Sequence, residues 1–201
     1  MPIRHHCPPP NTQKLILDMP LSYGDITDHI SGASLYNNGK YAWDSSLNAY
    51  VFSQNGSYGD SNVAWINNVN LYPITMTNPW IKREFDYYGV RKPDDNMFML
   101  SSSQKNQRAN WPVFMTDIYP SVLPLGNWYH IEQELKIKNG SVVLNVTYVN
   151  GTKTSVIVGF NVDNRQNQSA TRLYFTCGFY SGHSNYSYAM KNLKYWDLGS
   201  V

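Results

Sequence analysis

Hydrophobic and polar residues alternate most clearly in the second half of the chain, over 129–138. By the two-residue period, Ile131, Gln133, Leu135 and Ile137 share one face, and mostly charged residues share the other. Asn139-Gly140 follows directly, and this dipeptide favours the positive φ angles of a type I′ hairpin turn. The pattern therefore predicts a strand over 129–138 that ends in a tight turn.

The next stretch, 141–149, also alternates, and it ends at a second Asn-Gly pair, 150–151. One face is expected to point to the core, and it consists of Val142, Leu144, Val146 and Tyr148. The other face is expected to point to solvent, and it consists of Val143, Asn145 and Thr147. A further strand is expected over 155–162, so this region predicts an antiparallel meander of three strands.

Turn signals recur along the rest of the chain, for example at 31–32, 38–39 and 126–127. Between them lie runs of strand length rich in Val, Ile, Tyr, Phe and Thr, and no long segment shows helical periodicity. A chain of 201 residues can form one sandwich without division. We therefore expect an all-β, two-sheet antiparallel sandwich over 14–201.

Residues 1–13 predict an extended N-terminal arm, because Pro8, Pro9 and Pro10 favour a polyproline conformation. Such an arm is either flexible or docked on a partner. His5, His6 and Cys7 are metal-ligand types, but no second ligand group follows at matching spacing, so we expect no metal site. The start also lacks the apolar region of a secretory signal. Either a signal has been removed, or the protein reaches its destination without one.

Charged residues make up 15% of the chain, against about 25% in an average soluble domain, and the net charge is +2. There is no basic stripe, which argues against a nucleic-acid partner. No apolar stretch approaches the length of a membrane span, so we expect no membrane insertion. Asn, Ser, Thr and 16 tyrosines replace the missing charge. Such a surface suits packing against neighbouring subunits or binding neutral polar ligands.

The two cysteines, Cys7 and Cys177, are too few for a disulfide framework. By the two-residue period, Cys177 shares a face with Leu173, Phe175 and Phe179. One interpretation is a buried free thiol, since free cysteine is among the most buried residue types. The other is a Cys7–Cys177 bridge, which would imply an oxidising destination.

Six short motifs follow one another along residues 15–197. They are 15–20 (LILDMP), 28–32 (DHISG), 48–52 (NAYVF), 126–131 (GNWYHI), the hairpin 141–151 and 189–196 (AMKNLKYW). In this order they resemble the concanavalin A-like jelly rolls, in particular the laminin G-like and pentraxin-like branch. The resemblance implies two curved antiparallel sheets stacked face to face, with the closing strand beside the opening one. It implies little about activity, because the same fold serves lectins, adhesion modules, glycosidases and lyases.

Calcium is the commonest cofactor of the resembled family. Oxygen ligands could come from three acidic turns, formed by Asp60 and Asn62, by Asp94, Asp95 and Asn96, and by Asp163 and Asn164. Turns prefer the same residue types for their own backbone hydrogen bonds. We favour the turn interpretation and expect no cofactor.

Two pairs of carboxylates have a spacing that suits glycoside hydrolysis. Glu84 with Asp86, and Glu132 with Glu134, are two residues apart on expected strands, which separates them by about 6.5–7 Å. A glycosidase needs two carboxyl groups about 5–9.5 Å apart. Polar alternation on a solvated strand face also explains both pairs, and we favour that interpretation.

A polysaccharide lyase would need Arg, Gln, His and Tyr side chains to converge on a sheet. Arg83 and His130 are present, but nothing in their spacing joins them. No elbow motif supports a Ser–His–Asp triad. We therefore expect a protein that is not an enzyme, with a glycoside hydrolase or polysaccharide lyase on the same fold as the alternative.

Carbohydrate binding needs an aromatic ring for the C–H face of a sugar and amide or carboxylate groups for its hydroxyls. Two stretches offer such a combination: the first contains Tyr58, Asp60, Asn62 and Trp65, and the second contains Trp111 and Tyr119. The other interpretation is that these rings cap the ends of the sheets.

Six Asn-x-Ser/Thr sequons are candidate glycosylation sites, at Asn55, Asn139, Asn145, Asn150, Asn167 and Asn185. Together with the low charge and the arm, they favour a glycoprotein on an outer surface. The leading hypothesis is a non-catalytic recognition or structural module of a virion or cell surface. It would bind carbohydrate or neighbouring subunits, and the arm could link copies of the chain into a homo-oligomer.

Overall fold

The computed structural model describes residues 13–54, 63–69, 79–91, 99–103, 123–139, 141–157, 160–161, 172–177 and 186–200. Within these ranges the chain forms strands joined by turns and bends. This part of the chain contains no helix with the length and apolarity needed to cross a membrane. Residues 1–12, most of the predicted arm, lie outside the described ranges.

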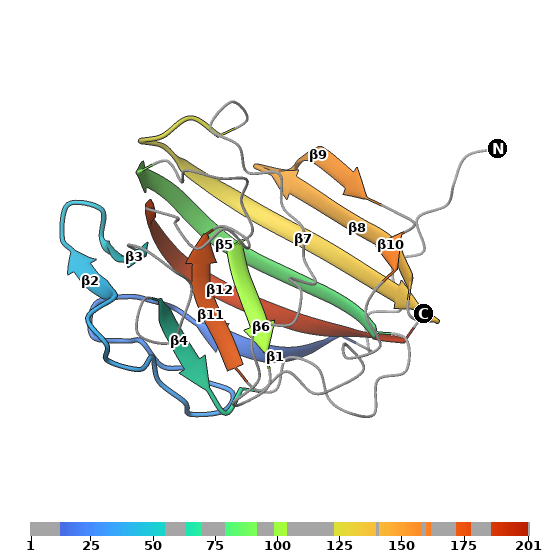
Figure 1. The fold of residues 1–201 in the computed structure, drawn as a ribbon, viewed down its shortest axis with the longest axis horizontal. Coiled ribbons are helices and arrows are strands. Elements are labelled where there is room, and N and C mark those ends of the chain that lie inside the picture. Colours follow the sequence, from blue (N-terminus) through green and yellow to red (C-terminus); the bar gives the residue numbers. More distant parts are fainter. Residues whose placement is uncertain are drawn as a thin grey trace.

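The larger sheet contains nine of the described strands, and all of their pairings are antiparallel. Its main path runs through β10 (Phe160–Asn161), β8 (Ser141–Val149), β7 (Trp128–Lys138), β5 (Pro79–Arg91), β12 (Tyr186–Ser200), β3 (Ala49–Gln54) and β2 (Tyr41–Asp44). In addition, β9 (Thr152–Ile157) pairs with β8, and β1 (Lys14–Met19) pairs with β12. The closing strand therefore lies beside the opening strand, as the resemblance implied (Figure 1).

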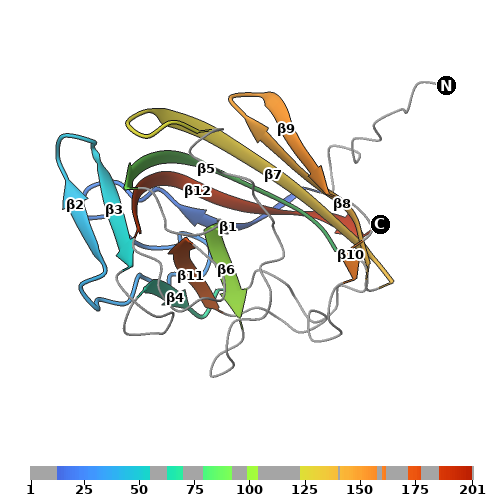
Figure 2. The same cartoon turned by 45° about the horizontal axis from the view of Figure 1, so that its top comes forward.

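The smaller sheet consists of β4 (Ala64–Asn67), β11 (Arg172–Cys177) and β6 (Met99–Ser103), with β11 in the centre. Figures 1 and 2 show these strands stacked over one face of the larger sheet, near β3, β5 and β12. This face is called the inner face below, and the opposite face of the larger sheet is called the outer face. The architecture is the predicted two-sheet antiparallel sandwich.

The core between the sheets follows from the two-residue alternation of the strands. In β7 the predicted face, from Ile131 to Ile137, is buried. Aromatic contacts join the two sheets, because the ring of Phe52 in β3 stacks on Phe175 in β11 at 4.4 Å between centroids. Full burial of one such ring stabilises the fold by about 1.5–3 kcal/mol.

The turn expected at 28–32 forms around the buried side chain of Asp28. Its carboxylate accepts backbone hydrogen bonds from Asp18 at 2.8 Å, Ile30 at 3.2 Å and Ser31 at 3.0 Å, and one from the Ser31 hydroxyl at 2.5 Å. Gly32 completes the turn at φ +74°, a region that favours glycine. One side chain therefore fastens this loop to β1.

The predicted facing of 141–149 is wrong for most of the strand. The β7–β8 hairpin begins as expected, with Ile137 opposite Val142, but Leu144 rather than Val143 lies opposite Lys136. One extra residue in β8 makes a β-bulge, and a one-residue shift moves every later side chain to the other face. Asn145 and Thr147 are consequently buried at 2% exposure instead of facing solvent.

The three-stranded meander itself is confirmed, as β7, β8 and β9 pair in order. The third strand begins at Thr152, three residues before the expected start at residue 155. Asn150 and Gly151 have φ values of +49° and +78°, so the second Asn-Gly turn has the expected conformation. The pairing continues close to this turn, which explains the earlier start.

A polar layer crosses the inner face of the larger sheet. Arg83 donates from Nε to Gln133 Oε1 at 2.6 Å and from Nη1 to the Tyr195 hydroxyl at 3.1 Å. Gln133 donates in turn to Thr147 Oγ1 at 3.1 Å. These side chains are buried, so their hydrogen bonds offset the cost of removing polar groups from water.

Candidate functional site

Trp65 is the one predicted ligand-binding residue within the described ranges, and it lies on β4. Alternation places Ala64 and Ile66 in the core and leaves Trp65 and Asn67 on the opposite face of the smaller sheet. The other predicted ligand-binding residues, Tyr58, Asp60, Asn62, Trp111 and Tyr119, lie outside the described residues. Their roles stay predictions.

Trp65 belongs to a stack of side chains that come from three separate segments. The Tyr36 ring stacks on the Trp65 ring at 4.4 Å between centroids and 11° between planes. The backbone holds this pairing, because Tyr36 N donates to Trp65 O at 2.9 Å and Leu35 forms a β-bridge with Ile66. The Arg172 guanidinium of β11 lies 4.3 Å from the centroid of the Trp65 ring.

Trp65 has two close neighbours. The Tyr36 ring stacks on it, and the Arg172 guanidinium lies over the same ring at a similar distance from its centre. Arg172 is itself held, since Nε donates to Asn67 Oδ1 and Nη1 donates to the Tyr174 hydroxyl at 2.9 Å. Trp65 therefore supports the Tyr36 ring, and its own role in ligand binding stays a prediction.

Tyr36 is the outermost ring of this arrangement, which we call the Tyr36 stack (Tyr36, Trp65, Arg172, Asn67 and Tyr174). The Tyr36 residue is 54% exposed, whereas Arg172 and Tyr174 are buried. A cation–π contact with arginine contributes about 0.5–2 kcal/mol and orders the ring it faces. The result is an exposed tyrosine ring on a rigid support, with a hydroxyl group at its edge.

The sequence did not reveal Tyr36 as a candidate. Tyr36 precedes the turn at 38–39 and lies 29 positions before Trp65, with no local periodicity to relate the two. The bridge between Leu35 and Ile66 brings them together. This bridge to β4 joins segments far apart in the chain, so only the folded structure shows that Tyr36 and Trp65 are neighbours.

The four candidate catalytic carboxylates meet on the outer face of the larger sheet. In the β5–β7 register Glu84 lies opposite Glu132 and Lys82 lies opposite Glu134. The two pairs predicted separately are therefore neighbours across two strands. Lys82 Nζ lies between them, at 2.6 Å from Glu132 Oε2 and 3.5 Å from Glu84 Oε2.

The pKa of Lys82 reflects this position. Partial burial alone would lower the pKa, but the hydrogen bond and charge of Glu132, together with Glu84, outweigh burial and raise it. Lys82 is therefore protonated at neutral pH and serves as the shared cation of both glutamates. Lys82 lies within ion-pair distance of both glutamates, and polar alternation on a strand face explains this arrangement without catalysis.

The remaining carboxylates are also engaged. Asp86 lies 2.9 Å from His130 Nδ1 and accepts a hydrogen bond from Asn192 Nδ2 at 2.7 Å. Glu134 accepts a hydrogen bond from Trp80 Nε1 at 2.6 Å. This pattern is a solvated network of ion pairs and hydrogen bonds, which agrees with the interpretation of these positions as an exposed strand face.

The side chains named for a lyase are divided between the two faces. Arg83 is on the buried inner face with Gln133 and Tyr195, whereas His130 pairs with Asp86 on the outer face. Because Arg83 is fully buried, its contacts with Gln133 and Tyr195 support the core. Among the described residues, no group of three or more His, Cys, Asp or Glu side chains could hold a metal ion.

The sequons occupy different environments. Asn139 and Asn150 are exposed at turns, and the Asn150 Oδ1 accepts a hydrogen bond from the backbone N of His130 at 2.9 Å. Asn145 is buried, so its expected position on the outer side of the hairpin is corrected. The other three sequons, Asn55, Asn167 and Asn185, lie outside the part of the chain that the structure describes, as do Cys7 and the three candidate calcium turns. Pairing of Cys7 with Cys177 stays a prediction.

No protein-family model matches the sequence, and no curated protein matches it significantly. Solved structures match over most of the chain. An alginate lyase is 12% identical, with a TM-score of 0.50, over 92% of this chain and 96% of its own. A botulinum neurotoxin type C structure, which concerns cell entry dependent on two ganglioside molecules, is 11% identical with a TM-score of 0.58.

A third similar structure is the binding domain of botulinum neurotoxin DC in complex with rat synaptotagmin II, at 11% identity and a TM-score of 0.52. This chain is covered over 93% by each of the two toxin structures and spans about half of their length, 48% and 49%. At such low identity the likeness shows the fold, a β-sandwich. It does not by itself show the concanavalin A-like family or an activity.

Proposed function

We propose that this chain is a non-catalytic recognition module that binds a saccharide on the exposed ring of Tyr36. The observation that carries the proposal is the Tyr36 stack, in which Tyr36, a residue that is 54% exposed, stacks on the half-buried Trp65, which contacts the buried Arg172. Sugar C–H groups pack on such a ring, and the hydroxyl at its edge can hydrogen-bond to the sugar. A support ordered before binding lowers the entropy cost of holding the ligand.

The comparisons support this proposal in a general way. The similar structures include a lyase named for alginate, a polysaccharide, and a toxin whose cell entry depends on gangliosides. One of them binds a protein, synaptotagmin II, which is consistent with protein partners on the same fold. We place the module outside the cell, on a virion or a cell surface, where it would contact carbohydrate or neighbouring subunits.

The carboxylates support binding more than catalysis. The four carboxylates on the outer face form ion pairs or hydrogen bonds with Lys82, His130 or Trp80. A hydrolytic enzyme is therefore the less favoured function on this fold. Removal of Glu84 or Glu132 is expected to leave saccharide binding unchanged.

A glycan and polysaccharide array on the purified protein tests the proposal, with the mass measured by light scattering in the same buffer. We expect saturable binding and a loss of about tenfold or more in affinity for Tyr36→Ala, equivalent to about 1.4 kcal/mol. Tyr36→Phe keeps the ring and is expected to retain most of the affinity. Val90→Ala, at another exposed apolar residue, is the matched control.

Two outcomes would contradict the proposal. One is saturable binding that Tyr36→Ala leaves at the wild-type level, which would place the ligand elsewhere. The other is no binding to any saccharide together with a defined oligomer. That result would identify a structural subunit, and the N-terminal arm would then be the segment to delete.

A further inference from the structure

A second exposed tyrosine is presented by a turn that the fold holds in place. Tyr23 lies between Ser22 and Asp25, whose backbones form a β-bridge and a 2.9 Å hydrogen bond from Asp25 N to Ser22 O. Leu21 before it is fully buried at φ +53°, a backbone conformation that leucine rarely adopts. Gly24 after it donates from its backbone N to the Tyr50 hydroxyl at 3.1 Å. The turn is therefore fixed on both sides of Tyr23.

The ring of Tyr23 meets Trp43 at an angle. Their centroids are 5.3 Å apart and their planes cross at 66°, and the Tyr23 residue is 77% exposed. Trp43 packs in turn against Tyr50, at 5.1 Å and 71°. Tyr50 contacts Tyr41, and Tyr41 contacts Phe52 in the core. The exposed Tyr23 and the half-buried Trp43 are thus the outer end of a row of packed aromatic rings.

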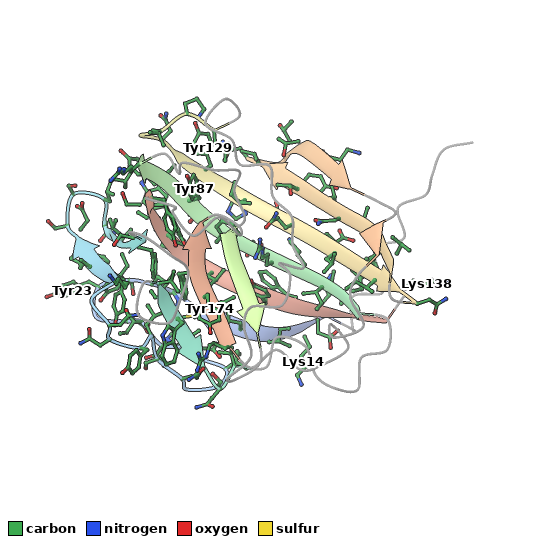
Figure 3. The ribbon with its side chains drawn as sticks, in the orientation of Figure 1. Lys14, Tyr23, Tyr87, Tyr129, Lys138 and Tyr174 are labelled. Atoms are coloured by element: carbon green, nitrogen blue, oxygen red, sulfur yellow. The ribbon has the colours of Figure 1, made fainter. Side chains whose placement is uncertain are left out.

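This corner is separate from the Tyr36 stack. Trp43 belongs to β2, the strand at the edge of the larger sheet, whereas the Tyr36 stack rests on β4 and β11 of the smaller sheet. Figure 3 shows Tyr23 at the edge of the molecule beside β2, away from Tyr174 on β11. A ligand on one set of rings does not need the other set.

Two carboxylates neighbour these rings in the sequence, and both have partners, His29 in the case of Asp25 at 2.9 Å. Asp44 follows Trp43 directly, and Asp25 lies two positions after Tyr23. Ser46 and Leu47 donate hydrogen bonds to Asp44 Oδ1, at 2.8 Å and 2.6 Å from Ser46 and 3.3 Å from Leu47. Because side chains alternate along a strand, Asp44 points to the face of β2 opposite to Trp43.

We propose that Tyr23 and Trp43 form a second saccharide site, which binds hexose units through their C–H faces. Two rings that cross at a steep angle contact a pyranose on one face and one edge, which a single flat ring cannot do. The inference rests on the proposed saccharide recognition but on different residues. With two sites, the chain binds multivalent glycans with higher avidity than either site alone provides.

The indole N–H signals of the six tryptophans provide separate readouts of the two sites by NMR. Trp43→Phe assigns the Trp43 signal, and the probes are the neutral hexasaccharides of glucose and mannose and the acidic hexamannuronate. We expect a neutral probe to shift the Trp43 signal saturably in the wild type and in Tyr36→Ala. Tyr23→Ala is expected to weaken this shift about tenfold or more. Ile30→Ala, at an exposed residue of the next turn, is expected to bind as the wild type does.

The outcomes separate the two proposals. If a neutral probe shifts only the Trp65 signal, and Tyr36→Ala removes that shift, the second site is refuted and the proposed function stands. If the Trp43 signal responds and Tyr36→Ala changes nothing, the second site stands and the Tyr36 site falls. A Trp43 response that Tyr23→Ala leaves at the wild-type size would also refute the second site. If no probe moves either signal, both proposals are refuted.

Discussion

The buried carboxylate of Asp28 offers a sharp test of how this fold is held together. Its two oxygens accept four hydrogen bonds, three of them from backbone N–H groups of Asp18, Ile30 and Ser31. Asp28→Ala removes the acceptor and leaves those donors without it. Hydrogen bonds to a charged acceptor contribute about 1.5–3 kcal/mol each, and these four are partly buried, so we expect the free energy of unfolding to fall by about 4 kcal/mol. A loss of that size is a large part of the usual 5–15 kcal/mol of stability.

Asp28→Asn distinguishes the contributions of the two carboxylate oxygens to stability. Oδ1 accepts from Asp18 and Ile30, whereas Oδ2 accepts from the Ser31 backbone and hydroxyl. An amide can replace only one oxygen as acceptor, and its NH₂ group then opposes the donors at the other position. We expect a loss of about 2 kcal/mol, roughly half of the alanine value.

Urea unfolding at pH 7, followed by tryptophan fluorescence, measures both changes. Asp25→Asn is the control, because the half-buried Asp25 carboxylate holds Thr27 N at 3.3 Å and His29 at 2.9 Å on the surface. Such a surface contact contributes about 0–1 kcal/mol. If Asp28→Ala cost no more than Asp25→Asn, the carboxylate would not fasten the loop, and the reasoning from its hydrogen bonds would be refuted.

Two other predictions concern the buried polar layer. Burial raises the pKa of Tyr195, although the charge and hydrogen bond of Arg83 act in the opposite direction. The tyrosine of the unfolded chain therefore ionises at a lower pH than the folded one. The stability linked to this phenol is complete below about pH 10 and is lost as the pH rises above it. In urea unfolding between about pH 10 and 11.5, Tyr195→Phe is expected to lose stability less steeply than the wild type, by up to about 1.4 kcal/mol per pH unit, and parallel curves would contradict this. The Asn145 Oδ1 is buried and has no hydrogen-bond partner within the described part of the chain. Asn145→Val is therefore expected to raise the free energy of unfolding by about 1 kcal/mol, whereas a fall of that size would show that the amide has a partner.

Local patterns in the sequence determined much of the fold. The alternation at 129–138 is the burial pattern of β7, and the Asn-Gly pairs mark the two hairpin turns that follow. The opening and closing motifs predicted strands that lie side by side, as β1 and β12 do. The alternation and the turns depend on the two-residue period and on turn chemistry, which act over a few residues and can be recognised in one sequence, whereas the pairing of β1 with β12 was implied by the family resemblance alone.

Tertiary structure decided the features that depend on register. The bulge at Val143 reversed the facing of Asn145, although the alternation of 141–149 looked regular. Glu84 faces Glu132, and Tyr36 stacks on Trp65, because strands far apart in the chain pair in one particular alignment. A sequence shows which residues share a face within one strand. Which faces meet depends on the free energy of packing the whole sheet, and a pattern within one short segment does not determine that free energy.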